Sequence, residues 1–201
     1  MKATNKLTDL HKSFRKDQDG VAAVEFAMVL PLVTMLFFGI VEFSDAMAAN
    51  RKAEHATTML VDLVSQEEFL THDEIDGIYT AVDHVLAPYG IEEPTMWVVS
   101  ITIDEDDKPI IDWSLDQDLT EPFARGSEFT ALSESELDLS GSDALITEGA
   151  SLIVAKIEFG YTSSLTNVNL DSVTLSNHDT RWPRRGTQIV YCDAQDQCSN
   201  E

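Results

Sequence analysis

Sequence patterns that accompany catalysis are missing from this chain of 201 residues. It has no HExxH pattern for a zinc protease, no GxSxG turn for a serine nucleophile and no glycine-rich phosphate loop. Each of these patterns places a specific reactive group, so their absence argues against the chemistry that they serve. We therefore predict that the chain is not an enzyme, hydrolyses no nucleotide and uses no cofactor.

Cysteine is scarce as well, with Cys192 and Cys198 as the only two. No histidine or second cysteine pair lies near them in the sequence, which argues against a zinc site. In an oxidising compartment the two would form a disulfide around the loop Asp-Ala-Gln-Asp-Gln, and in a reducing one they would be free thiols. We predict the disulfide, on the condition that this part of the chain lies outside the cytoplasm.

Basic residues are few, since 13 Lys and Arg stand against 36 Asp and Glu, for a net charge of −23. The imbalance belongs to the later part of the chain. Residues 1–20 carry five basic and three acidic residues, whereas residues 50–201 carry eight and thirty. Such an acidic surface repels phosphate backbones, so we expect no nucleic-acid partner.

One long apolar run dominates what the sequence does contain. From residue 21 to residue 41 there are 21 residues whose only charge is Glu25. A helix of that length measures about 31 Å, which matches a bilayer core of about 30 Å. We predict a basic leader over residues 1–20, a transmembrane helix in a lipid bilayer over residues 21–43, and an exterior domain over residues 44–201.

The charges on either side of this run predict its orientation. Lys and Arg collect on the cytoplasmic side of a membrane helix. Five of them precede the run, and only Arg51 and Lys52 follow it closely. We therefore expect the N-terminus in the cytoplasm and the later domain on the other side of the membrane.

Two cleavage sites are compatible with the residues around the run. Ala46-Met47-Ala48 fits the Ala-x-Ala rule of signal peptidase, although the run before it is longer than in an ordinary signal. A cut after Gly20 would instead make Val21 a new N-terminus with a positive amine. Glu25 would then be residue five of the mature chain, where the amine of a neighbouring subunit can pair with its costly intramembrane charge. Alternatively, Glu25 lies at the headgroup boundary and needs no partner.

The residues around these positions resemble a known family. The sequence reads Gly-Val-Ala-Ala-Val-Glu-Phe-Ala-Met-Val-Leu-Pro from Gly20 to Pro31, and Phe-Gly-Ile-Val-Glu-Phe over residues 38–43. This order of Gly, Glu, Pro and a second Glu is similar to that of the TadE-like family. Its members are pseudopilin-type proteins of the Tad (tight adherence) system, which builds Flp-type pili in bacteria.

The resemblance covers about residues 15–55 and implies a structural role in pilus assembly, adhesion or secretion. It implies cleavage between Gly20 and Val21 by the Tad prepilin peptidase. The implied partners are other Tad pilins and pseudopilins and the inner-membrane Tad assembly platform, with the exterior domain in the periplasm. Residues in the matched pattern with an implied role in subunit assembly are Glu25, Pro31 and Glu42.

A different function is compatible with the residues outside this pattern. The chain would then be a cell-envelope protein with an enzymatic or ligand-binding exterior domain, anchored or released by signal peptidase after Ala48. The two interpretations differ in the mature N-terminus, which is Val21 for the first and an uncut or Ala49 start for the second. Mass spectrometry of the mature terminus separates them.

Downstream of the run the sequence predicts an α+β domain of pilin-like architecture. No Pro or Gly interrupts residues 44–66, so the first helix should continue past the membrane. Thr71 and Glu74 form a capping-box pattern that begins a second helix, which Pro88 ends. Later segments rich in β-branched residues predict an antiparallel sheet. The predicted strands cover residues 96–103, 110–115, 151–161, 168–175 and 187–192.

One cluster of basic and aromatic residues occurs in the acidic domain, at Arg181, Trp182 and Arg184. Trp and Arg are enriched at interface hot spots, so one interpretation is a docking point for another subunit. The other is a surface loop whose arginines pair with nearby carboxylates. Residues 104–107 and 167–171 contain cation-binding residue types, but a solvated turn and an exposed strand face explain them better, and we predict no metal site.

Overall fold

The structure, a computed structural model, describes residues 19–87, 91–106, 108–133, 137, 151–161, 173–192 and 198. Within them lie two helices, α2 (Asp19–Ser65) and α3 (His72–Leu86). The strands are β1 (Phe69–Thr71), β2 (Ile91–Ile103), β3 (Pro109–Asp116), β4 (Ser151–Tyr161), β5 (Val173–Arg181) and β6 (Val190–Cys192). The chain divides into two compact units between Asp45 and Ala46, and α2 contributes residues to both. The predicted α+β fold is confirmed.

Helix α2 begins at Asp19 and continues through Pro31 to Ser65. Beyond Ala46 it is amphipathic, because small and aliphatic residues recur every three or four positions. The predicted continuation of the helix past the apolar run is therefore confirmed. The residues of its buried face, each no more than 2% exposed, include Ala49, Ala53, Ala56, Leu60 and Val64.

Helix α3 begins with the predicted capping box. Thr71 Oγ1 accepts a hydrogen bond from the Glu74 backbone N at 3.4 Å, and the Glu74 carboxylate accepts one from the Thr71 backbone N at 2.9 Å. This backbone donor lowers the pKa of Glu74, because it stabilises the charged form. The buried face that follows has the spacing of a helix lying on a sheet, and consists of Ile75, Tyr79, Val82 and Leu86.

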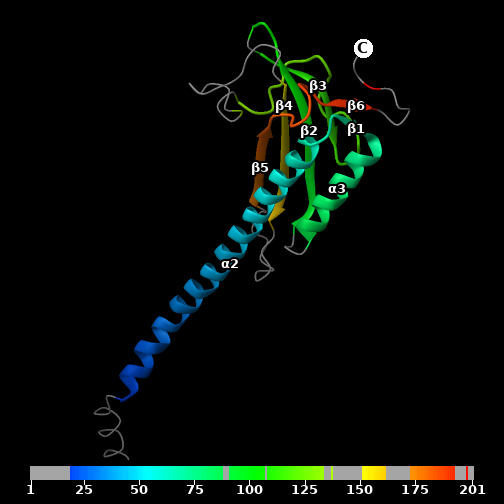
Figure 1. Cartoon of the computed structure of the whole chain (residues 1–201). Helices are drawn as coiled ribbons and strands as arrows, with labels where there is room; N and C mark the ends of the chain where they lie inside the picture. Colours follow the sequence, from blue (N-terminus) through cyan, green and yellow to red (C-terminus); the bar gives the residue numbers. More distant parts are fainter. Residues whose placement is uncertain are drawn as a thin grey trace, which may run out of the picture. The chain divides into compact units, whose positions relative to one another are not determined.

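The four longer strands form one antiparallel sheet in the order β3-β2-β4-β5 (Figure 1). A turn joins β2 to β3, and in it the Asp104 carboxylate accepts hydrogen bonds from the backbone N of Asp106 and of Lys108. β2 pairs with β4 on its other side, so these two strands form the centre of the sheet. The predicted antiparallel sheet is confirmed, and β4 has the predicted bounds.

The sheet separates two apolar cores. On one face, Met96 and Val98 of β2 pack with the buried residues of α2 and α3. Figure 1 shows the last turns of α2 lying over the strands. On the other face, Val99 and Ile101 of the same strand belong to a second core. That core is completed by residues after β3, namely Phe129, Leu132 and Leu137.

The last two predicted strands differ from the observed ones. The sequence predicts a strand over residues 187–192, but only Val190–Cys192 is extended, as β6. It pairs in parallel with β1, a three-residue strand that the sequence does not reveal. Because β1 is so short, the strand pairing that defines β6 is limited to three residues as well. The strand predicted over residues 168–175 is observed as β5, which continues to Arg181 because pairing with β4 outweighs its polar composition. Residues 167–172 lie outside the described residues.

Thr71→Ala should lower the free energy of unfolding by about 1 kcal/mol, because it removes the side chain that caps the first turn of α3. The measurement is chemical unfolding of the full chain in detergent, followed by circular dichroism. Thr80→Ala is the matched control, since Thr80 is exposed within α3 and alanine favours a helix. An equal loss of stability in both variants would contradict the capping role.

Candidate functional site

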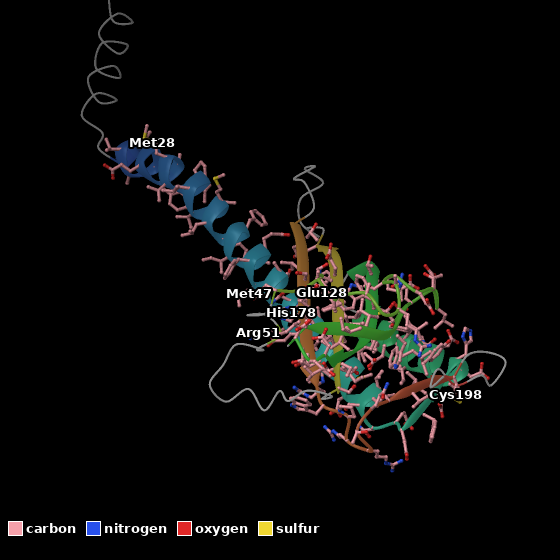
Figure 2. The ribbon with its side chains drawn as sticks, turned by 90° about the horizontal axis from the view of Figure 1, so that it is seen from above. Met28, Met47, Arg51, Glu128, His178 and Cys198 are labelled. Carbon is pink, nitrogen blue, oxygen red and sulfur yellow. A yellow bond between two sulfur atoms is a disulfide. The ribbon has the colours of Figure 1, made fainter. Side chains whose placement is uncertain are left out.

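The first part of α2 presents apolar side chains in every direction. With the exception of the half-buried Val41, the large apolar residues from Val21 to Phe43 are exposed, whichever side of the helix they occupy. In Figure 2 the side chains around Met28 project from all sides of the ribbon. A helix that is apolar all round is stable only where protein or lipid covers it. By length and composition, this helix is able to cross a membrane.

The polar groups of the apolar segment have distinct positions. Thr34 Oγ1 donates a hydrogen bond to the Leu30 carbonyl at 2.8 Å, so this hydroxyl is satisfied within the helix. Pro31 lacks a backbone N–H and therefore leaves one carbonyl of the preceding turn without its usual donor. Glu42 is half-buried near the end of the segment, whereas Glu25 is exposed near its start. Within the described residues Glu25 forms no ion pair.

Two glycines of this segment lie in open space. Gly20 and Val21 are the second and third residues of α2 and are both exposed. No atom of the described residues lies within 4 Å of the position that a Cβ of Gly20 or of Gly39 would occupy. The described part of the chain therefore does not itself require glycine at these positions. Around Gly39 there is a hollow of about 440 Å³, lined by Leu32, Met35, Leu36, Ile40 and Phe43.

The predicted basic and aromatic cluster lies where β5 ends and a loop begins. Arg181 pairs with Asp179, with 3.1 Å between Nη2 and Oδ2. Arg184 pairs with Asp62 of α2. Both arginines thus use carboxylates of their own chain, as the surface-loop interpretation expects. Trp182, which lies between them, is 43% exposed, and its role in docking stays a prediction.

Cys192 and Cys198 are joined by a disulfide. Cys192 ends β6 and is buried, whereas Cys198 is exposed. Beside the bridge, the Tyr191 hydroxyl lies 3.2 Å from Nδ1 of His72, the first residue of α3. The disulfide and this contact tie the end of the described chain to the β1–β6 pair.

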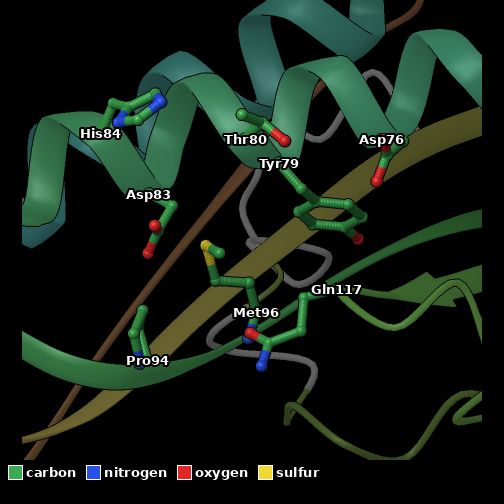
Figure 3. Close-up of a pocket in the computed structure, with 8 residues that line it drawn as sticks. All are labelled: Asp76, Tyr79, Thr80, Asp83, His84, Pro94, Met96 and Gln117. Atoms are coloured by element: carbon green, nitrogen blue, oxygen red, sulfur yellow. The ribbon is translucent and has the colours of Figure 1, made fainter.

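A cavity that the sequence does not reveal lies between α3 and the first part of β2. Its volume is about 570 Å³, and Figure 3 shows the side chains that line it. Asp76 and Asp83 project from α3 toward the strand, where Pro94 and Met96 face them. Both carboxylates belong to exposed residues, so the cavity is an acidic opening with an apolar floor.

Two hydrogen bonds fix the inner end of this cavity. The Tyr79 hydroxyl donates to the Leu115 carbonyl at 2.7 Å, and Gln117 Oε1 accepts from the Met96 backbone N at 3.2 Å. Burial raises the pKa of Tyr79, and the charge of Asp116 adds to the effect, so Tyr79 stays a neutral donor. The cavity therefore suits a positively charged or aromatic group. Among the described residues, no three His, Cys, Asp or Glu side chains are grouped so as to hold a metal ion.

A half-buried carboxylate is the other feature that sequence reasoning missed. Asp112 is the extra residue where the pairing of β2 with β3 shifts register. Its Oδ2 accepts hydrogen bonds from Thr102 Oγ1 at 2.6 Å and from Ser100 Oγ at 3.2 Å. Burial raises the pKa of Asp112, while these hydrogen bonds and the charge of Arg125 oppose the rise. Both hydroxyls are used as donors to the carboxylate, which gives the group a structural role.

These features define an α+β domain that follows an apolar helix able to cross a membrane. Residues 20–60 match the sequence model of the family described as TadE-like protein. The matched residues include Gly20, Glu25 and Pro31, and the match confirms the resemblance seen in them. No curated protein and no solved structure matches the chain.

Asp112→Asn should change how stability depends on pH. Because the folded pKa of Asp112 is raised, its protonation favours the folded state, and this contribution is complete below the ordinary value of 3.8. The contribution is lost as the pH rises through the folded pKa. The unfolding free energy of the unsubstituted chain minus that of the variant should therefore grow as the pH falls from neutral toward 3.8.

Urea unfolding of the full chain in detergent, at a series of pH values, measures this difference. Asp106→Asn is the control, because it removes a carboxylate of the same kind from an exposed turn. A difference for Asp112 that shrinks as the pH falls, or that matches the control, would show that burial does not govern this carboxylate.

Proposed function

We propose that this chain is a TadE-like pseudopilin, a membrane-anchored structural subunit for the assembly of Tad, or Flp-type, pili, and not an enzyme. The proposal is carried by the coincidence of two features in the same residues. The segment that matches the TadE-like family, residues 20–60, contains the apolar part of α2, which no other described residue covers. Such a surface requires lipid or other apolar helices, and an assembly subunit in a membrane has both.

The proposed topology places residues 1–20 in the cytoplasm, residues 21–43 in the bacterial inner membrane and the domain from residue 44 on in the periplasm. The excess of Lys and Arg in the first twenty residues supports this orientation. The disulfide between Cys192 and Cys198 supports it as well, because disulfides persist in the oxidising periplasm.

Processing after Gly20 by the Tad prepilin peptidase completes the proposal. It would produce the Val21 amine, which is a partner of the right charge for an intramembrane Glu25 of a neighbouring pilin or pseudopilin. Gly39 would let a neighbouring helix approach closely, since its surroundings are open and apolar. The Tad assembly platform in the inner membrane would receive the processed subunit.

Release by signal peptidase after Ala48 has weaker support. The sequence Ala46-Met47-Ala48 lies inside α2, and the next residue, Ala49, belongs to the buried face of the helix. A cut after Ala48 would break α2 at the point where its buried face begins. This face of the helix covers the sheet. The alternative function is a cell-envelope protein with an enzymatic or ligand-binding exterior domain. We retain it only for the case in which the mature chain is found to start at Ala49.

Gly20→Val should leave the leader of 20 residues attached and block assembly. A peptidase subsite that accepts only hydrogen would collide with the valine side chain. The folded chain itself has space for a side chain there, so the substitution reports on the peptidase. Gel mobility and mass spectrometry of the N-terminus measure leader removal, and surface piliation measures assembly.

Gly39→Val is the matched control for cleavage. It makes the same chemical change in the same helix, also in open space, but far along the chain from the proposed cut. This variant should mature at Val21. A mature start at Val21 in the Gly20→Val protein would show that the processing site is assigned wrongly.

Glu25→Gln should leave cleavage intact and impair subunit association. The amide keeps the shape of the side chain and loses its charge, so the contact with a neighbour's amine should weaken by about 1–3 kcal/mol. Glu54→Gln is the control, because Glu54 is an exposed residue of α2 beyond the apolar run. Co-purification with other pilus components and piliation are compared in both variants. Normal piliation by cleaved Glu25→Gln protein would leave Glu25 as a carboxylate at the membrane boundary.

A further inference from the structure

Exposed aromatic side chains are rare in the unit that begins at Ala46. From residue 48 on, the large apolar side chains exposed among the described residues are Phe69, at 55%, and Trp182, at 43%. Both lie in segments joined to the region where α2 ends. Phe69 begins β1 shortly after that end, and the loop after Trp182 is attached there by the Arg184 backbone N, which donates to the Ser65 carbonyl at 2.8 Å.

Residues 181–185, termed the Trp182 loop, are attached to the end of α2 through Arg184. Arg181 and Arg184 are already used in ion pairs with Asp179 and Asp62. Arg185 is exposed, and it forms no ion pair with any described residue. The anchored loop therefore presents an exposed indole, and an uncommitted guanidinium lies close by in the chain. In a strongly acidic domain, such a surface fits an acidic partner with an apolar centre.

The cavity beside α3 has the complementary character. Its Asp76 and Asp83 carboxylates suit a guanidinium, which binds carboxylates strongly and with defined geometry. The buried Pro94 and Met96 close its floor, so a ring that enters the cavity contacts little charge from below (Figure 3). No residue of the Trp182 loop is among the described residues that line it, so the chain does not fill this cavity with its own loop.

We propose that the Trp182 loop of one copy docks into the α3 cavity of a second copy of this chain. Trp182 enters the cavity between α3 and β2, and Arg185 pairs with Asp83 at its opening. The two surfaces are different, so the contact is heterologous, and every copy keeps one loop and one cavity for its next neighbours. A series of such head-to-tail contacts can continue from copy to copy without closing. The proposal rests on the proposed role of the chain as an assembly subunit.

Cysteine cross-linking of the full chain in membranes tests this geometry. Asp83→Cys and Arg185→Cys are combined in one chain and treated with a mild oxidant. The native cysteines of the described chain are already joined to each other, so they leave the new pair to react. We expect a ladder of dimers, trimers and larger species, because each copy links to two neighbours.

The control pair is Asp73→Cys with Arg185→Cys. Asp73 is an exposed carboxylate of the same helix that does not line the cavity, so this pair should give no ladder. Equal ladders from the two pairs would overturn the proposal. Efficient dimers from Arg185→Cys alone, with no ladder from the pair, would show a loop-to-loop contact and overturn it as well.

A charge exchange tests the named ion pair independently of new thiols. Arg185→Glu and Asp83→Arg should each weaken self-association in detergent by about tenfold, and the double variant should regain most of it. Trp182→Ala should weaken self-association by at least as much. Failure of the double variant to recover, with both single variants folded by circular dichroism, would exclude the pair.

The same membranes also report on the proposed function. Mass spectrometry reads the mature N-terminus in each sample, and this readout does not depend on the Trp182 loop. A start at Val21 without a ladder would overturn the docking contact and leave the pseudopilin assignment in place. A ladder without processing at Val21 would support the contact and overturn the assignment.

Discussion

Burial of one face of α2 is the contact on which the domain after Ala46 depends. The first residues of that face are alanines, and their small side chains let the helix backbone lie close to the sheet. The approach extends to β5, where Asn177 Nδ2 donates to Asn50 Oδ1 at 3.3 Å. Larger side chains, Leu60 and Val64, fill the space toward the end of the helix. Among the described elements α2 shares this core with α3, so a substitution that disturbed the buried face of α2 would expose part of the sheet.

The chain after β5 secures the end of that helix. Trp113 of β3 is buried and donates from Nε1 to the Ile189 carbonyl at 2.8 Å. Arg184 reaches Asp62 and the end of α2, and β6 pairs with β1. Segments that are more than a hundred residues apart in the sequence therefore meet at one end of the domain. These contacts explain why the polar Trp182 loop can hold a defined conformation at this end of the domain.

Local sequence signals predicted the elements that depend on local interactions. The apolar run, the capping box at Thr71 and the β-branched segment that became β4 were all readable, because each signal lies within a few residues. β1 was not readable, since three residues become a strand only when Val190 is beside them. β5 extends over polar residues for the same reason, because its partner β4 supplies the ladder. In the candidate site, the residues of the matched pattern were identified through their resemblance to the TadE-like family, because their spacing alone left two interpretations open.

The surfaces of the domain were less accessible to sequence reasoning. The cavity beside α3 forms only when Asp83 and Met96, from different elements, face each other across the gap between helix and sheet. The position of Asp112 depends on a shift of register between two strands, which composition does not encode. A sequence shows that Asp76 and Asp83 lie seven residues apart on one helix, but not that apolar side chains lie opposite them.

The two parts of α2 contribute differently to an assembly. A segment that is apolar on every side binds lipid and other helices without preferring one direction, because hydrophobic association is not directional. In the proposed assembly, register would come from exceptional positions of this segment, such as the charged Glu25 and the small Gly39. Contacts between folded domains can add direction, since they join surfaces of different shape and charge. In the proposed assembly, affinity for the membrane and order among the subunits would thus come from separate residues of α2 and of the domain that follows it.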